Sequence, residues 1–225
     1  MRRRSRLSAN SGPGEGVRGN REVSPTSGKA RTPSPVAVAI TGGIGAGKSE
    51  ALLAFARHGA ATASSDEIVH RLLRDDEEVH AALRERWGDR VVGQGGADRR
   101  AIAEIVFAEP DELAWLEGLL HPRVVREYTA WRNELAAADE PPKILAVEIP
   151  LLYETGGERR FDAVVVVTAP PEVRAGRSAV AGDARERRLI PDEEKVARAD
   201  FAYVNDGSLE ELDEFVADVL AQLTP

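Results

Sequence analysis

The chain has 225 residues, of which 42% are hydrophobic and 30% are charged, a balance that supports a packed globular domain and excludes wholesale disorder. No window approaches 18 uninterrupted apolar residues, so we expect no transmembrane helix. The chain contains no cysteine, which excludes disulfides, zinc fingers, iron–sulfur clusters and thiol catalysis.

The net charge of −8 is the sum of two unlike segments. Residues 1–34 hold seven Arg and one Lys against two Glu, a net charge of +6, which leaves −14 on residues 35–225. The first segment is rich in Gly, Ser, Pro and Arg and has no apolar period, so we interpret it as a disordered basic tail. It lacks the apolar stretch of a secretory signal, and an arm that binds nucleic acid or acidic lipid remains an alternative to a solvated extension. Because the body is acidic, any anion that it binds must be held by a local site.

An ordered domain is predicted over residues 35–225, with buried strands alternating with helices. Short runs of β-branched residues predict strands of a parallel sheet, and apolar residues at helical spacing predict the helices. The predicted strands are 36–40, 60–63, 144–147, 163–167 and 201–204, and the predicted helices are 50–58, 66–73 and 209–223. Residues 75–138 show only helical patterns. This order predicts a three-layer α/β fold with a mainly parallel sheet and a helical subdomain.

The most specific motif is a complete G-x-x-x-x-G-K-[ST] pattern at residues 42–49, between a predicted strand and a predicted helix. Its glycines let backbone N–H groups converge on a phosphate, and the helix N-terminus adds a favourable dipole. Lys48 is expected to reach the β- and γ-phosphates, and the Ser49 hydroxyl to take one Mg²⁺ coordination position. The residues expected to hold the nucleotide are Gly43, Ile44, Gly45, Ala46, Gly47, Lys48, Ser49 and Glu50.

Other nucleotide-binding motifs are missing from the chain. The loop contains no G-x-G-x-x-G in any register, which disfavours a dinucleotide site. No N-K-x-D guanine-recognition motif occurs either. The sequence therefore favours an ATP-binding P-loop protein over a GTPase.

Further motifs follow the phosphate loop in order. They are D-x-[ILV]-x-[HR] at 66–70, D-R-x-x-[LI] at 98–102, L-L-H-P at 119–122, P-L-L-[FY]-E at 150–154 and P-x-x-E-K…A-D-[FY]…N-x-G-S over 191–208. The ordered set resembles the dephospho-CoA kinase family. The resemblance implies a P-loop NTPase fold that transfers the γ-phosphoryl group of MgATP to the ribose 3′-hydroxyl of dephospho-CoA. It also implies a core of about 35–74 and 143–225, a CoA-binding helical insertion of about 75–140 and a lid of about 174–195.

Two carboxylates are predicted to lie beside the phosphate loop. Asp66 follows the second predicted strand, at the sheet edge where ligands bind in open α/β folds. The resemblance implies that it accepts the proton of the ribose hydroxyl, whereas its spacing alone is more typical of a helix N-cap. Glu148 ends another strand and is a candidate, with Ser49, for holding Mg²⁺ or orienting its ligands.

For the substrate pocket, the resemblance points to Arg99, His121 and Glu154. His121 has no acid or Ser partner at a recognisable spacing, so a structural role is the alternative for it. Glu154 is also compatible with an ordinary loop carboxylate. The resemblance further implies that Asn205 contacts adenine, although Asn-Asp-Gly is also a common turn sequence.

The arginine-rich stretch within the expected lid is a candidate for stabilising the transferred phosphoryl group. Arg177 aligns best with the family, and a solvated basic helix is the alternative for the stretch, which contains Arg174, Arg177, Arg185, Arg187 and Arg188. The chain departs from the family pattern in two places. Ser64 stands where the family usually has a first Asp, and the lid is shorter, with Ala181-Gly182 in place of an Arg-Asp pair.

We therefore expect a cytoplasmic kinase that uses ATP and Mg²⁺ on dephospho-CoA. It is expected to be a monomer or a weak oligomer and to bind neither nucleic acid nor membranes. One alternative is another small-molecule P-loop kinase that acts on a nucleoside or nucleotide. The other is a non-catalytic ATP-binding regulator, for which Ser64 and the shortened lid are the support.

Overall fold

The computed structural model describes residues 34–177 and 189–224, within a compact unit that spans residues 33–225. The predicted basic tail falls outside the described residues except for Ser34. So do the middle of the predicted lid and its arginines 185, 187 and 188.

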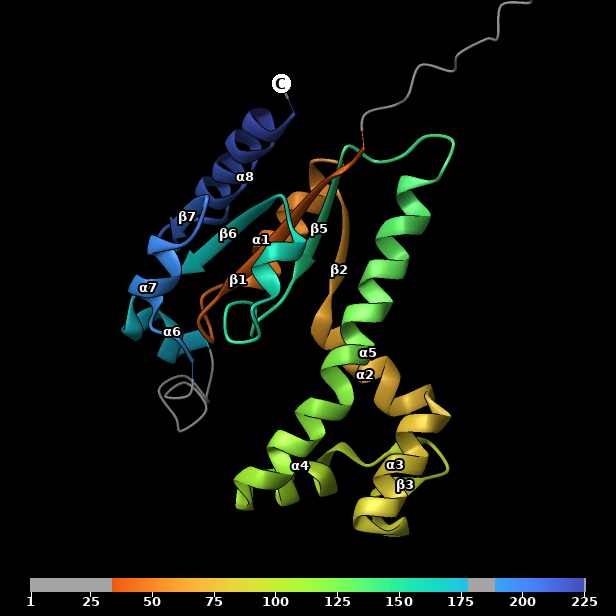
Figure 1. Ribbon diagram of the computed structural model, residues 1–225. Coiled ribbons are helices and arrows are strands. Elements are labelled where there is room, and N and C mark those ends of the chain that lie inside the picture. The colour runs from red at the N-terminus through yellow and green to blue at the C-terminus, as the bar shows by residue number, and fades with distance from the viewer. Residues whose placement is uncertain (1–33, 178–188, 225) are drawn as a thin grey trace, which may run out of the picture. The chain divides into compact units, whose positions relative to one another are not determined.

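The centre of this unit is a five-stranded parallel sheet in the order β2-β5-β1-β6-β7 (Figure 1). The strands are β1 (Val36–Gly42), β2 (Ala61–Ser64), β5 (Ile144–Glu148), β6 (Ala163–Thr168) and β7 (Phe201–Val204). All five predicted strands are confirmed, with bounds that differ by at most two residues at either end. Because β1 lies between β5 and β6, both of its neighbours cover its edges and its apolar side chains from Ala37 to Ile40 are fully buried.

Helices cover both faces of the sheet, which gives the predicted three layers. On one face, α1 (Lys48–Arg57) and α8 (Leu209–Leu223) bury Phe55 and Val216 against Val165. On the other face, Val147 of β5 packs with the helical residues Ile68 and Tyr128, and Val164 of β6 packs against Leu152 in the turn after β5. Alternate residues of β6 point to opposite faces, as the period of two in a strand requires. The shorter helices α6 (Pro171–Arg177) and α7 (Asp192–Ala197) and the 3₁₀ turn η2 (Gly157–Arg160) complete the α/β part.

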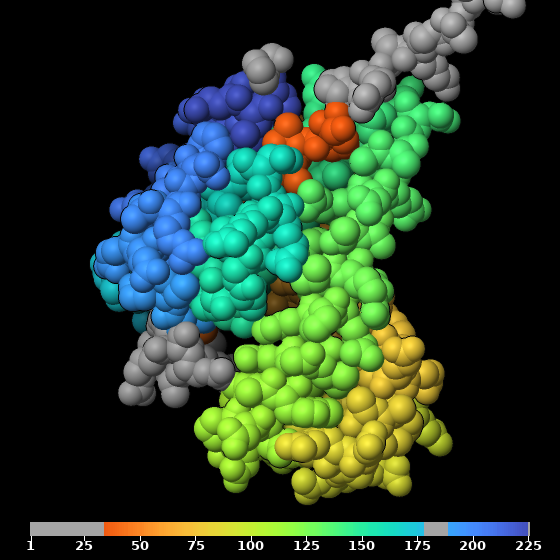
Figure 2. Space-filling view, viewed as in Figure 1, coloured from red at the N-terminus to blue at the C-terminus, as the bar shows by residue number. Residues whose placement is uncertain are grey.

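Residues 65–136 form a second hydrophobic cluster beside the sheet, which joins the predicted helical block of about 75–140 to the helix that precedes it. It consists of α2 (Ser65–Asp75), α3 (Glu77–Trp87), the 3₁₀ turn η1 (Asp89–Val91), α4 (Arg99–Ala108) and α5 (Pro110–Ala136), with a hairpin of β3 (Val92–Gly93) and β4 (Gly96–Ala97). The side chains of Asp76 and Asp98 cap α3 and α4, and so define where these helices begin. In Figure 1, α5 runs beside the β2 edge of the sheet and continues into the block, and Figure 2 shows a hollow between the two parts. The sequence pattern predicted only helices over residues 75–138 and so did not predict the hairpin.

None of the helices in residues 34–177 and 189–224 combines the length and the apolar character that crossing a bilayer requires.

Candidate active site

The phosphate loop joins β1 to α1 and depends on glycine. Gly45 and Gly47 have φ values of +74° and +99°, a region that other residues enter only with strain. Gly47 is the N-cap of α1, and a Cβ at this position would collide with Nδ2 of Asn205. Lys48 Nζ donates a hydrogen bond to the Gly43 carbonyl oxygen at 2.9 Å. The Lys48 side chain therefore contacts the phosphate loop, as the motif predicts.

The charge of Lys48 is set by its surroundings. Burial lowers the pKa of Lys48, while the nearby carboxylates of Glu148 and Asp66 act in the opposite direction. Both carboxylates that the sequence placed beside the loop are thus close enough to interact with the lysine. A phosphate in the loop would add a further negative charge next to Lys48 and favour its protonated form.

The side chains of Glu148 and Ser49 lie next to each other at the start of α1. Ser49 Oγ lies 3.3 and 3.4 Å from the two carboxylate oxygens of Glu148, which is 6% exposed. Burial raises the pKa of Glu148, partly opposed by Lys48. A hydroxyl and a carboxylate are the oxygen ligands that Mg²⁺ prefers, with phosphates and water in its other positions. Residues 34–177 and 189–224 hold no cluster of three or more His, Asp or Glu suited to a metal.

Asp66 lies in the first turn of α2, exposed at the border of a cavity of about 600 Å³. The N-cap of this helix is Ser64, so the alternative interpretation of Asp66 as the cap is wrong. Ser64, at the end of β2, pairs with Glu148 at the end of β5. Asp66 follows Ser64 by two residues, so it lies at the same edge of the sheet as Glu148 and Lys48. The rest of the cavity wall is mainly apolar and includes Val124 and Tyr128 of α5.

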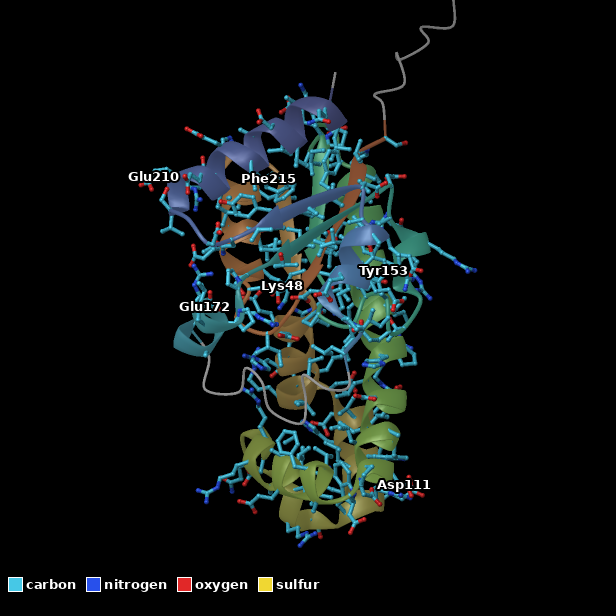
Figure 3. The ribbon with its side chains drawn as sticks, turned by 90° about the vertical axis from the view of Figure 1, so that its left-hand side faces the viewer. Lys48, Asp111, Tyr153, Glu172, Glu210 and Phe215 are labelled. Carbon is cyan, nitrogen blue, oxygen red and sulfur yellow. The ribbon has the colours of Figure 1, made fainter. Side chains whose placement is uncertain are left out.

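A second cavity, also of about 600 Å³, connects the phosphate loop with the helical block. Its lining includes Lys48 from the loop, Phe107 from α4, His121 from α5 and Glu154. His121 lines both cavities, so it marks the place where they adjoin. Figure 3 shows Lys48 at the end of the sheet that faces the helical block.

A third cavity, of about 740 Å³, borders the phosphate loop at Gly43. Arg174 and Asp192 also line it, and Arg174 Nη1 lies 3.6 Å from Asp192 Oδ2. A Cβ on Gly43 would lie 2.6 Å from Arg174 Nη1, so this guanidinium is next to the loop. The sequence favoured Arg177, which also lies beside the loop: its Nη1 would be 3.7 Å from a Cβ on Gly47, and it donates to the Asn205 carbonyl oxygen at 3.3 Å.

Asn205 follows β7 and is 4% exposed. Its Nδ2 donates to the Ala46 carbonyl oxygen at 2.9 Å, and its backbone N–H donates to the Thr168 carbonyl oxygen at 2.7 Å. The Asn205 side chain thus fixes the phosphate loop from a position 159 residues further along the chain.

The described geometry joins a phosphate loop to neighbouring cavities, and comparison with known proteins identifies the family. The profile of the family described as dephospho-CoA kinase matches residues 36–211. The chain belongs to the dephospho-CoA kinase family. The dephospho-CoA kinase of Chlorobaculum tepidum is 38% identical over 201 residues, which cover 84% of this chain and 95% of that protein.

Solved structures agree with this assignment to the dephospho-CoA kinase family. A crystal structure of a Thermus thermophilus protein superposes with a TM-score of 0.68 at 36% identity, covering 85% of this chain and 100% of the other. The structure of a dephospho-CoA kinase from Campylobacter jejuni gives a TM-score of 0.64 at 25% identity, covering 84% and 96% of the two chains.

Two residues that the dephospho-CoA kinase resemblance assigned to the substrate have other surroundings here. Arg99 is exposed in the first turn of α4 and does not line any of the three cavities described above. Glu154 lines the second cavity, but its Oε1 lies 2.9 Å from Nζ of the buried Lys195. The sequence pattern did not single out Lys195, although it is one of only four lysines and is part of the P-x-x-E-K motif.

Proposed function

We propose that this protein phosphorylates the 3′-hydroxyl of the ribose of dephospho-CoA with ATP, giving coenzyme A and ADP. Membership of the dephospho-CoA kinase family supports the choice of substrates. The observation that carries the proposal is the position of Lys48 and Asp66, one on each of two adjoining cavities that share His121. This arrangement provides separate spaces for a nucleotide donor and an acceptor. The positively charged Lys48 lines one space and the negatively charged Asp66 lines the other.

On the donor side, the backbone N–H groups of residues 43–49 hold the phosphates, and Lys48 exchanges its bond to Gly43 for the β- and γ-phosphates. Ser49 and Glu148 hold Mg²⁺, which when bound neutralises charge that develops on the phosphate oxygens. Asn205 keeps the loop in shape and borders the nucleotide from the β7 side. Arg177 and, from its position beside Gly43, Arg174 add positive charge at the phosphates.

On the acceptor side, Asp66 accepts the proton of the ribose 3′-hydroxyl. The hydroxyl oxygen then forms the bond to the γ-phosphorus as the bond from that phosphorus to the β-phosphate oxygen breaks. His121 lies where the two cavities adjoin and orients the acceptor. A substrate contact at Arg99 remains a prediction from the family resemblance.

The remaining features of the proposal concern the setting of the reaction. The protein acts as a monomer or weak oligomer in the cytoplasm. The net charge of −14 on residues 35–225 supports the expectation that this part does not bind nucleic acid.

A coupled assay of ADP release tests the function directly. Dephospho-CoA is expected to support turnover, while nucleosides and nucleoside monophosphates are not. Lys48→Met, in which the phosphate contact is lost, serves as the inactive control. Turnover of a nucleoside in place of dephospho-CoA would identify a different small-molecule kinase, and ATP binding without turnover of any acceptor would identify a regulator.

A further inference from the structure

A buried ion pair lies at the wall of the cavity that contains Lys48. Lys195, on α7, is fully buried, and its Nζ lies 2.9 Å from Oε1 of Glu154. Glu154 lines this cavity together with Lys48. Burial lowers the pKa of Lys48, and the positive charge of Lys195 acts in the same direction, so the two lysines are close enough to interact.

The Glu154 carboxylate is only partly satisfied by hydrogen bonds. Its Oε1 accepts a hydrogen bond from the Ile190 backbone N–H at 3.0 Å. Its Oε2 is buried without a hydrogen-bond partner among the described residues, and the contact with Lys195 is an ion pair rather than an aligned hydrogen bond. A carboxylate in such surroundings is costly unless a cation lies beside it, and Lys195 supplies that cation.

The charge of Glu154 matters because phosphates are expected in the neighbouring space. Lys48 already has two carboxylates nearby, Glu148 and Asp66. A third, uncompensated carboxylate on the same cavity wall would repel the phosphates of a nucleotide. Solvent screens such repulsion weakly in a partly buried site.

We propose that Lys195 is a positioning residue for phosphoryl transfer: it neutralises Glu154 and holds the carboxylate at the Ile190 amide, so that the wall shared with Lys48 does not repel the nucleotide. This role rests on the proposed kinase function and deepens it. Glu154 then acts as the partner of Lys195, and it binds neither the substrate nor the metal.

A double-mutant cycle over this pair tests the proposal. The proteins are the wild type, Lys195→Met, Glu154→Gln and the double variant, with the Kd for ATP measured by calorimetry and Tm measured for each. Lys195→Met is expected to weaken ATP binding roughly ten- to a hundredfold, because an unpaired carboxylate then lies near the phosphates. Glu154→Gln alone and the double variant are expected to bind ATP within about twofold of each other, because no charge is left to neutralise.

Arg198→Met is the matched control. Arg198 lies three residues beyond Lys195, its Nη2 forms an ion pair of 2.8 Å with Glu158, and neither residue is among the described residues that line the three cavities. Its loss is expected to leave the ATP affinity unchanged. If it weakens ATP binding as much as Lys195→Met does, the effect is a general one of this segment and the proposal is overturned.

A direct role of Lys195 on phosphate predicts a different result, because the double variant would then bind ATP as weakly as Lys195→Met. That outcome overturns the proposal. If Lys195→Met does not fold, the comparison of Glu154→Gln with the double variant decides: equal affinities support the proposal, and a loss of more than about tenfold in the double variant contradicts it.

ATP binding is measured without dephospho-CoA, so the cycle is independent of the acceptor. A wild type that binds ATP but does not phosphorylate dephospho-CoA would contradict the proposed function, while the cycle would still report on Lys195.

Discussion

At the scale of single residues, the chemistry is concentrated on a few side chains that burial and neighbouring charges modify. Lys48 is half-buried and lies near two carboxylates, of which Glu148 is buried and Asp66 is exposed. This difference in exposure separates their proposed roles. Glu148 is suited to a fixed position beside Ser49, whereas Asp66 is accessible to an acceptor in the adjoining cavity.

Asp66→Asn is expected to lower kcat by about 10²–10⁴-fold, because the variant cannot accept the proton of the acceptor hydroxyl. The Kd for ATP and Tm are expected to stay close to those of the wild type, since Ser64 and not Asp66 occupies the N-cap position of the helix. Glu67→Gln removes an exposed carboxylate from the same helical turn and is the control. Similar losses of kcat in both variants would refute the assignment of the base.

Glu148 is expected to couple metal affinity to pH. Because burial raises the pKa of Glu148, protons compete with Mg²⁺ at a higher pH than they would at an ordinary glutamate. As the pH falls from neutral, the KM for Mg²⁺ should therefore rise earlier than expected for an exposed carboxylate. Steady-state kinetics across pH would measure this, and Glu148→Gln should show a high KM with little pH dependence.

The raised pKa of Glu148 also makes the stability of the folded protein depend on pH. A raised folded-state pKa means that the ionised form disfavours folding, so this destabilisation is absent below the ordinary glutamate pKa and grows as the pH rises toward the folded-state pKa. Without Mg²⁺ and ATP, Glu148→Gln should raise Tm at neutral pH, by roughly 2–4 °C for each 1 kcal/mol gained. Thermal unfolding at neutral and acid pH would show the gain vanish in acid.

At the scale of elements, the phosphate loop takes its shape from segments distant in the chain. Asn205, after β7, holds the Ala46 carbonyl oxygen, and α6 brings Arg174 beside Gly43. The loop thus depends on the packing of β7 and α6 as well as on its own glycines.

Gly47→Ala is expected to abolish ATP binding, because its φ of +99° strains any other residue and the new Cβ collides with Asn205. Gly59→Ala is the matched control, since Gly59 has a φ of +88° and a Cβ added there would meet nothing within 4 Å. Both changes should cost about 1–3 kcal/mol in backbone strain. Calorimetry with ATP should therefore separate the two variants even where their Tm values agree, and equal ATP affinities would contradict the role of Asn205.

At the scale of the whole molecule, an acidic body binds polyanionic substrates. Residues 35–225 carry a net charge of −14, so the attraction for phosphates must come from the backbone amides of the loop and a few enclosed cations. The basic excess of the chain lies in residues 1–34, outside the family match of 36–211.

Removal of residues 1–33 is expected to leave kcat, both KM values and Tm unchanged, because the family match begins only at residue 36 and the phosphate loop, Asp66 and Glu148 all lie beyond the removed segment. Parallel ADP-release assays and thermal unfolding of the two forms would measure this. Binding of a labelled DNA duplex at low salt provides a second readout. A duplex that binds to the full chain and not to the shortened form would support the basic-arm alternative for the tail.

The sequence by itself determined the strands, the main helices and the phosphate loop, because short β-branched runs, helical spacing and the glycine pattern are local properties. It also located Lys48, Ser49 and Asp66, which belong to local motifs at strand ends. Only the tertiary structure decided the strand order, the positions of Arg174 and Arg177 beside the phosphate loop and the pairing of Glu154 with Lys195. These depend on which segments meet when β1 is placed between β5 and β6, and no local pattern specifies a contact between side chains that are far apart in the chain.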